Sequence, residues 1–213
     1  MREPLFDYLD ETFGKNRVLE EKVIQRSRAD VVVVLPGKIA GIEIKSDSDS
    51  YTRLVTQIHD YERNYDLCYL AVGKKHRLHA AEHVPPYWGL LLIDEEHVEE
   101  LRPAAPSPKL DLRRQLKILW KRELWHILDT RGLPKYRDRS ADFIIGKLLE
   151  KLPLEELRQA ETDELFERDY TIFDEKMKAS NEVRKTKTGV RVRKKRAPSL
   201  TKHVIRRRKR GKA

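Results

Sequence analysis

The stretch Arg28-Ala-Asp-Val-Val-Val-Val-Leu-Pro-Gly-Lys-Ile-Ala-Gly-Ile-Glu-Ile-Lys45 decides the fold, because it holds two apolar runs joined by a turn signal. Residues 31–35 form a continuous apolar run, which is typical of a strand buried on both faces. Pro36-Gly37 predicts a turn, and residues 39–45 are the expected hairpin partner. We therefore expect two neighbouring strands near 30–35 and 39–45.

Three charged side chains accompany these strands. Side chains alternate between the two faces of a strand, so Glu43 and Lys45 point the same way, and Asp30 stands at the start of the neighbouring strand. Magnesium prefers oxygen ligands and is usually bound by one or two carboxylates. Lys45 stands where an ammonium group can orient or activate a water molecule. A Glu-x-Lys triplet also occurs on solvated strand faces and in cross-strand ion pairs, so the triplet alone does not establish a site.

A helix is expected after the second strand. Residues 46–50 alternate Ser and Asp, which is typical of turns and N-caps. Apolar residues then recur at helical spacing over 50–65, which predicts an amphipathic helix packed on the sheet. On this helix Arg53, Gln57 and Tyr61 are four residues apart and share one stripe. Packing is the alternative role for Gln57 and Tyr61.

Asp30, Glu43, Lys45, Gln57 and Tyr61 occur in the order and spacing Asp, Glu-x-Lys, then Gln-x-x-x-Tyr on a helix. This pattern resembles the PD-(D/E)XK, or restriction-endonuclease-like, nuclease superfamily, and within it the RecB-type and small standalone bacterial or phage nucleases. The resemblance covers roughly residues 15 to 95. The Pro that gives the superfamily its name is absent, because Ala29 stands before the Asp.

The resemblance implies a role for each matching residue. Asp30 and Glu43 would bind Mg²⁺ or Mn²⁺, Lys45 would assist the attacking water, and Gln57 and Tyr61 would border the catalytic site. The superfamily often adds an acidic residue from a helix before the first strand. Glu21, with Glu20 as the alternative, is expected in that place. The implied fold is α/β, with a mixed sheet flanked by helices.

Composition limits the class of protein. No apolar stretch approaches the roughly twenty residues that a membrane-spanning helix needs, so no membrane partner is expected. The acidic N-terminus does not resemble a signal or transit peptide. Cys68 is the single cysteine and is expected to be buried in a strand, which excludes an intrachain disulfide and a thiolate zinc cluster. We expect a soluble cytoplasmic protein.

The net charge of +10 is unevenly distributed. Residues 184–213 contain fifteen Lys and Arg and no Asp or Glu, which leaves residues 1–183 with a net charge of −5. Such a tail is expected to be disordered when free and to bind polyanions in a salt-sensitive way. The candidate nucleic-acid-binding residues are Arg53, Lys74, Lys75, Arg193, Lys194, Lys195, Arg196, Arg206, Arg207, Arg208, Lys209 and Arg210.

Four segments are expected: a nuclease-like domain at 1–102, a Pro-rich linker at 103–109, a helical module at 110–178 and a disordered basic tail at 179–213. The first domain should begin with one or two helices over 1–25. It should continue, after the hairpin and its helix, with strands over 66–73 and 89–94 and a short helix over 76–83.

The helical module should contain a helix over 112–128 that ends at Arg131-Gly132, a second helix capped by Ser140, and a third opened by Pro153. Gly132-Leu133 followed by the basic residues 135–139 resembles a SAP-type DNA-binding module. A plain helical hairpin is the alternative.

The sequence leads to two main hypotheses. In the first, the protein is a Mg²⁺- or Mn²⁺-dependent nuclease that hydrolyses phosphodiester bonds in DNA. In the second, it is a catalytically inactive nucleic-acid-binding protein on a nuclease-derived fold. DNA is the expected partner, and RNA is the alternative. The oligomeric state is open, and cleavage of both strands would call for a dimer or two events.

Overall fold

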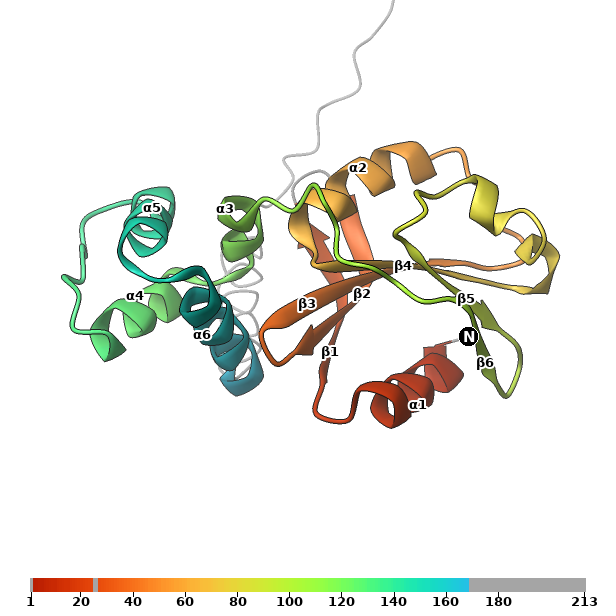
Figure 1. Ribbon diagram of the computed structural model, residues 1–213, viewed down its shortest axis with the longest axis horizontal. Helices are drawn as coiled ribbons and strands as arrows, with labels where there is room; N and C mark the ends of the chain where they lie inside the picture. Colours follow the sequence, from red (N-terminus) through yellow and green to blue (C-terminus); the bar gives the residue numbers. More distant parts are fainter. Residues whose placement is uncertain (1, 25–26, 169–213) are drawn as a thin grey trace, which may run out of the picture. The chain divides into compact units, whose positions relative to one another are not determined.

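A computed structural model of the chain describes residues 2–24 and 27–168. They form a mixed α/β fold around a six-stranded sheet with the order β1-β2-β3-β4-β5-β6 (Figure 1). The strands are β1 (Arg17–Ile24), β2 (Ser27–Leu35), β3 (Lys38–Lys45), β4 (Leu67–Val72), β5 (Gly89–Ile93) and β6 (Val98–Arg102). The central pairs β3·β4 and β4·β5 are parallel, and the outer pairs are antiparallel. The expected α/β class with a mixed sheet and flanking helices is confirmed.

The β2–β3 hairpin forms as the sequence predicts. Val31 to Val34 are fully buried, because helices cover both faces of the sheet. The turn needs a left-handed residue, and Gly37 supplies it with φ of +68°. The register runs from Leu35 opposite Lys38 to Val31 opposite Ile42.

Helices α1 (Arg2–Phe13) and α2 (Leu54–Asn64) cover opposite faces of the sheet (Figure 1). On the α1 face the buried core contains Leu5, Leu9, Val31, Val33, Ile42, Ala71 and Leu91. On the α2 face Tyr61 packs against Tyr65 and Trp88. The Tyr65 ring lies so close to Gly41 of β3 that a Cβ there would come within 2.3 Å of it. A glycine at this position therefore lets α2 approach the sheet.

Two strands differ from the expectations. Residues 17–24 form β1 and not a helix, although Glu and Lys in this segment favour a helix. Backbone pairing with β2 outweighs that local preference, since the apolar hairpin would otherwise leave its edge unpaired. Strand β6 was not expected, because Val98-Glu-Glu-Leu-Arg102 is mostly charged; it pairs with β5 at the other edge.

The segment between β4 and β5 contains two short 3₁₀ turns, η1 (Lys74–His76) and η2 (Ala80–Glu82), where one helix over 76–83 was expected. After β6 come α3 (Leu112–Gln115), η3 (Leu116–Ile118), α4 (Lys121–Thr130), α5 (Ala141–Lys151) and α6 (Leu154–Glu167). The helix expected over 112–128 is thus interrupted, because Leu119 and Trp120 adopt extended conformations.

Other helix ends follow the sequence signals. Gly132 has φ of +66°, and Leu133 N–H donates to Leu128 C=O at 2.8 Å, which is a Schellman ending for α4. The Ser140 side chain caps α5 by accepting a hydrogen bond from Phe143 N–H, and Pro153 precedes α6.

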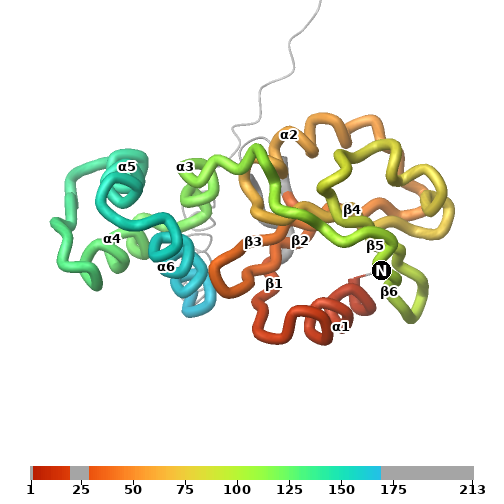
Figure 2. The backbone as a smooth tube through the Cα atoms, viewed as in Figure 1, coloured from red at the N-terminus to blue at the C-terminus, as the bar shows by residue number. Residues whose placement is uncertain are grey.

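The segment 103–109 was expected to be a linker, but it is held against the sheet domain. Ala105 N–H donates to Tyr87 C=O and Ser107 N–H donates to Asp66 C=O. Figure 2 shows the chain running from β6 back across to α3. The helices that follow are joined to the same unit, since residues 1–168 cluster together.

Asp66, a buried residue before β4, joins these helices to the sheet. Its carboxylate accepts hydrogen bonds from Ile39 N–H at 2.9 Å, Gln115 Nε2 at 2.8 Å and Arg158 Nη1 at 2.5 Å. Thr162 of α6 accepts a hydrogen bond from Gly37 N–H in the hairpin turn at 3.0 Å.

Among the described helices, none has the length and apolar character needed to cross a bilayer.

Candidate active site

The β2–β3 register brings the predicted carboxylates together. Val31 pairs with Ile42, so one further step places Asp30 opposite Glu43. Oδ2 of Asp30 accepts a hydrogen bond from Ile44 N–H at 2.9 Å, which fixes the Asp30 side chain against β3. Its Oδ1 makes no hydrogen bond to a described residue. As far as the described side chains are concerned, this oxygen is available to a further ligand.

Glu43 is the centre of a cluster of four side chains. Its Oε1 accepts hydrogen bonds from Lys45 Nζ at 2.7 Å and from Gln57 Nε2 at 2.6 Å. Its Oε2 accepts one from Tyr61 OH at 2.9 Å. Lys45 Nζ also donates to Gln57 Oε1 at 3.2 Å. Glu43 and Lys45 are only 2% and 4% exposed, so the ion pair is shielded from bulk water.

Two of the three partners of Glu43 lie on helix α2, and the helical period places both on the same side. Gln57 and Tyr61 are four residues apart and face β3, as the stripe on the predicted helix implied. Arg53 is the N-cap residue of α2 and is exposed, so it lies at the solvent end of the same stripe. The preceding loop is held by Asp49, whose Oδ2 accepts hydrogen bonds from Ser46 N–H and Oγ.

The buried cluster changes the acid–base properties of its members. Burial raises the pKa of Glu43 above the ordinary range, and the neighbouring Asp30 charge raises it further. The hydrogen bond and charge of Lys45 act in the opposite direction on the same pKa. Burial and the Glu43 charge raise the pKa of the Tyr61 hydroxyl, which therefore remains a hydrogen-bond donor. A further positive charge near Asp30 and Glu43 would favour the ionised carboxylates.

The donor set fits a magnesium ion that keeps several of its water ligands. Asp30 and Glu43 offer two carboxylates from adjacent strands, which is the number that such sites commonly use. Oε2 of Glu43 accepts one hydrogen bond and retains a lone pair. Within the described part of the chain, no group of three or more His, Cys, Asp or Glu side chains is gathered as a metal site.

Backbone register distinguishes the two candidates for a third carboxylate. Both residues lie on β1 and not on a helix, which corrects the expectation from the resemblance. Glu20 is aligned with Val31, and Lys22 is aligned with Ala29. Glu21 therefore falls opposite Asp30, in the same row as Glu43.

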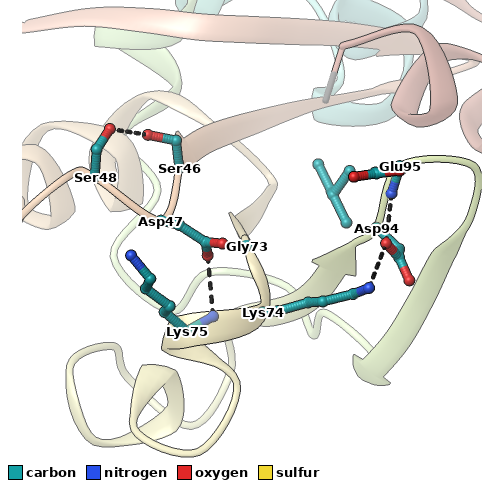
Figure 3. A pocket seen from close by; sticks show the side chains of 9 residues that line it. Ser46, Asp47, Ser48, Gly73, Lys74, Lys75, Asp94 and Glu95 are labelled. Carbon is teal, nitrogen blue, oxygen red and sulfur yellow. Dashed lines mark hydrogen bonds and ion pairs between the residues drawn. The ribbon is translucent and has the colours of Figure 1, made fainter.

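A pocket lies where β3, β4 and β5 end, and its lining begins at Ser46, the residue after Lys45 (Figure 3). It has a volume of about 420 Å³ and is lined by Ser46, Asp47, Ser48, Gly73, Lys74, Lys75, Ile93, Asp94 and Glu95. Lys74 and Lys75, two of the residues expected to contact phosphate, lie here, and only the Lys74 ammonium group has a partner among the described residues. Lys74 Nζ pairs with Asp94 at 2.7 Å, and Lys75 N–H donates to Asp47 Oδ1 at 3.0 Å.

Asp47 and Gly73 are pocket residues that the sequence analysis did not single out. A Cβ at position 73 would lie 2.3 Å from Asp47 Oδ1, so a side chain there would displace the Asp47 carboxylate from its present position. The signal in the sequence is a glycine at position 73, at the end of the apolar run that predicts a buried strand. The remaining nucleic-acid-binding candidates, Arg193 to Arg196 and Arg206 to Arg210, lie outside the described residues. Residues 169–178 of the predicted helical module also lie outside them.

Comparison with known proteins gives a sequence-family match and one solved structure. No curated protein matches it significantly. A solved structure, the SPO1766 protein of unknown function from Silicibacter pomeroyi, is 27% identical; the match covers 64% of this chain and 94% of that chain, with a TM-score of 0.44. The family described as bacteriophage P4 protein cII matches residues 3–197, which is most of the chain. The chain therefore belongs to the bacteriophage P4 protein cII family.

Proposed function

We propose that this protein is a divalent-metal-dependent nuclease of the PD-(D/E)XK type that hydrolyses phosphodiester bonds in DNA. One observation carries the proposal: Glu43, Lys45, Gln57 and Tyr61 form a single hydrogen-bonded cluster, with Asp30 beside it on the neighbouring strand. A solvated Glu-x-Lys pair would leave these side chains exposed. Here both charges are buried on the face that α2 covers.

The two carboxylates would hold Mg²⁺ or Mn²⁺, and Glu21 is the favoured third ligand because its register position lies opposite Asp30. When bound, the metal would neutralise charge on the phosphate and make a water molecule more acidic. Asp30 is oriented for this role by Ile44 N–H. Tyr61 and Gln57 hold Glu43 in one orientation, which reduces the rearrangement needed for binding.

Lys45 would position the attacking water and stabilise negative charge at the phosphorus. Its ammonium group is held between Glu43 Oε1 and Gln57 Oε1, so two of its three donors are directed by the protein. The third donor remains for water or a phosphate oxygen. Such fixed donors act most strongly where bulk water is excluded, and Lys45 is only 4% exposed.

One observation favours the second candidate, a catalytically inactive nucleic-acid-binding protein. Lys45 already balances the Glu43 charge at 2.7 Å, so the cluster satisfies itself without a metal. In that case the buried ion pair would be structural. The two candidates differ in a measurable property, because only the nuclease requires affinity for a divalent ion at Asp30 and Glu43.

Cleavage by the purified protein distinguishes the two candidates. Linear, nicked, flapped and single-stranded DNA, together with RNA, would be incubated with Mg²⁺, Mn²⁺ or EDTA. We expect metal-dependent cleavage of DNA that Asp30→Asn and Lys45→Ala abolish. Glu11→Gln, an exposed acid on α1, is the matched control and should cleave normally. No cleavage of any substrate, or cleavage that survives both site substitutions, would refute the proposal.

Calorimetric titration with Mn²⁺ gives a readout that does not depend on choosing the right substrate. Wild-type protein should bind the ion, and Asp30→Asn should bind it more weakly. Binding that is equal in both proteins would place the ion elsewhere.

A further inference from the structure

A second group of side chains lies on α5 and on the connector that joins α4 to α5. Phe143, in the first turn of α5, is 37% exposed. The Tyr136 ring meets it edge to face, with 5.4 Å between centroids and 73° between planes. The Arg139 guanidinium lies 5.3 Å and Lys147 Nζ lies 6.0 Å from the Phe143 centroid. We call Tyr136, Arg137, Arg139, Phe143 and Lys147 the aromatic-basic surface.

The connector holds Tyr136 in an uncommon backbone conformation. Its φ is +45°, in the left-handed region that an aromatic residue seldom adopts. Tyr136 C=O accepts a hydrogen bond from Arg139 N–H at 3.0 Å, and Lys121 Nζ donates to Arg137 C=O at 3.2 Å. These contacts fix a short turn that carries Tyr136, Arg137 and Arg139. The conformation is maintained at an energetic cost, which fits a functional surface.

The charges on this surface are only partly neutralised. Arg137 and Arg139 are exposed, and neither forms an ion pair with a carboxylate of the described residues. Lys147 is paired with Glu150 at 2.6 Å. Asp138 is the acid between the two arginines, so the connector keeps a net positive charge. The Phe143 ring, which is 37% exposed and flanked by cations, is thus partly accessible to a ligand.

We propose that the aromatic-basic surface binds single-stranded nucleic acid, with a base stacked on Phe143 and backbone phosphates at Arg137 and Arg139. Bases stack on aromatic side chains whatever their sequence, and cations beside the ring follow the backbone. A duplex hides the faces of its bases, so it would use the arginines but not the ring. An acidic protein partner would likewise need only the charges. This proposal does not depend on hydrolysis at Asp30 and Glu43.

The test is a binding measurement with the full-length chain in EDTA, which prevents metal-dependent cleavage. Fluorescence anisotropy would compare labelled oligothymidylate, oligouridylate and a DNA hairpin of equal charge. Phe143→Leu keeps apolar bulk but removes the ring, and it should weaken single-strand binding roughly 5- to 150-fold. Hairpin binding by this variant should stay unchanged. Thermal melting would verify that the variant is folded.

Two variants separate charge from stacking. The double variant Arg137→Gln/Arg139→Gln should weaken binding to all three ligands. The slope of log affinity against log salt concentration should fall by the amount that corresponds to about two phosphate contacts. Leu154→Ala removes an exposed apolar side chain on α6 and is the matched control, which should bind normally.

The proposal would be overturned if Phe143→Leu left the affinity for single strands unchanged. It would also be overturned if this variant lost the same affinity for the hairpin as for the single strands. Similar loss for oligothymidylate and oligouridylate would mean that the surface accepts both DNA and RNA. Asp30→Asn should retain full binding in EDTA. A failed nuclease assay therefore leaves this proposal standing, and a failed binding assay leaves the nuclease proposal standing.

Discussion

Replacing Lys45 with methionine should destabilise the fold in a pH-dependent way. The substitution keeps much of the side-chain volume but leaves the Glu43 carboxylate, 2% exposed, without its cation. Breaking a buried ion pair from one side costs about 3–5 kcal/mol. Gln57 and Tyr61 still donate to Glu43. We therefore expect a loss near the lower limit, about 3 kcal/mol at about pH 8.

The direction of the pH dependence follows from the pKa of Glu43. Burial raises this pKa in the folded chain, so the folded state holds the proton more tightly than the unfolded state does. Ionising Glu43 therefore costs stability as the pH rises from its ordinary value through the raised one. Lys45 limits that cost in the wild type, and its removal raises the pKa further. The difference between wild type and variant should be small at about pH 4 and grow as the pH rises.

Urea unfolding monitored by circular dichroism across this pH range measures the effect. The double variant Glu43→Gln/Lys45→Met carries no buried charge and should regain part of the lost stability at about pH 8. Arg77→Met, which breaks the exposed pair with Glu99, is the matched control and should unfold like the wild type. A Lys45→Met loss that does not change with pH, or a double variant less stable than the single one, would refute this explanation.

Three further substitutions test the fold. Gly41→Ala should cost about 1–3 kcal/mol of unfolding free energy, because its Cβ would clash with the Tyr65 ring; normal stability in urea would contradict that packing. Arg158→Met should destabilise the chain by about 3 kcal/mol, because it leaves buried Asp66 without its cation. An unchanged melting temperature would mean that the Arg158–Asp66 pair does not stabilise the fold. Gly132→Ala should cost about 1 kcal/mol, measured in the same way, since φ of +66° strains any residue with a Cβ.

Much of the candidate site followed from local sequence. The apolar runs 31–35 and 39–45 formed the expected hairpin, and the alternation of side chains placed Glu43 and Lys45 on one face. The period of α2 brought Gln57 and Tyr61 to that face. These features depend on periodicity within a few residues, which a sequence displays directly.

Other features depend on contacts between distant segments. Strand β1 forms because β2 offers an edge to pair with, although its own Glu and Lys residues favour a helix. The helical part is joined to the sheet through Asp66, whose partners Gln115 and Arg158 are 49 and 92 residues away along the chain. No local pattern in the sequence indicates such pairings.

The binding position of a metal decides between the two proposed roles of the buried cluster. A crystal soaked in Mn²⁺ would be examined by anomalous diffraction at the manganese edge. Our proposal predicts a peak between the carboxylates of Asp30 and Glu43 in the wild type and its absence in Asp30→Asn. A wild-type crystal with no peak there, and with Lys45 still paired to Glu43, would show that this cluster is structural and would contradict a metal-dependent nuclease.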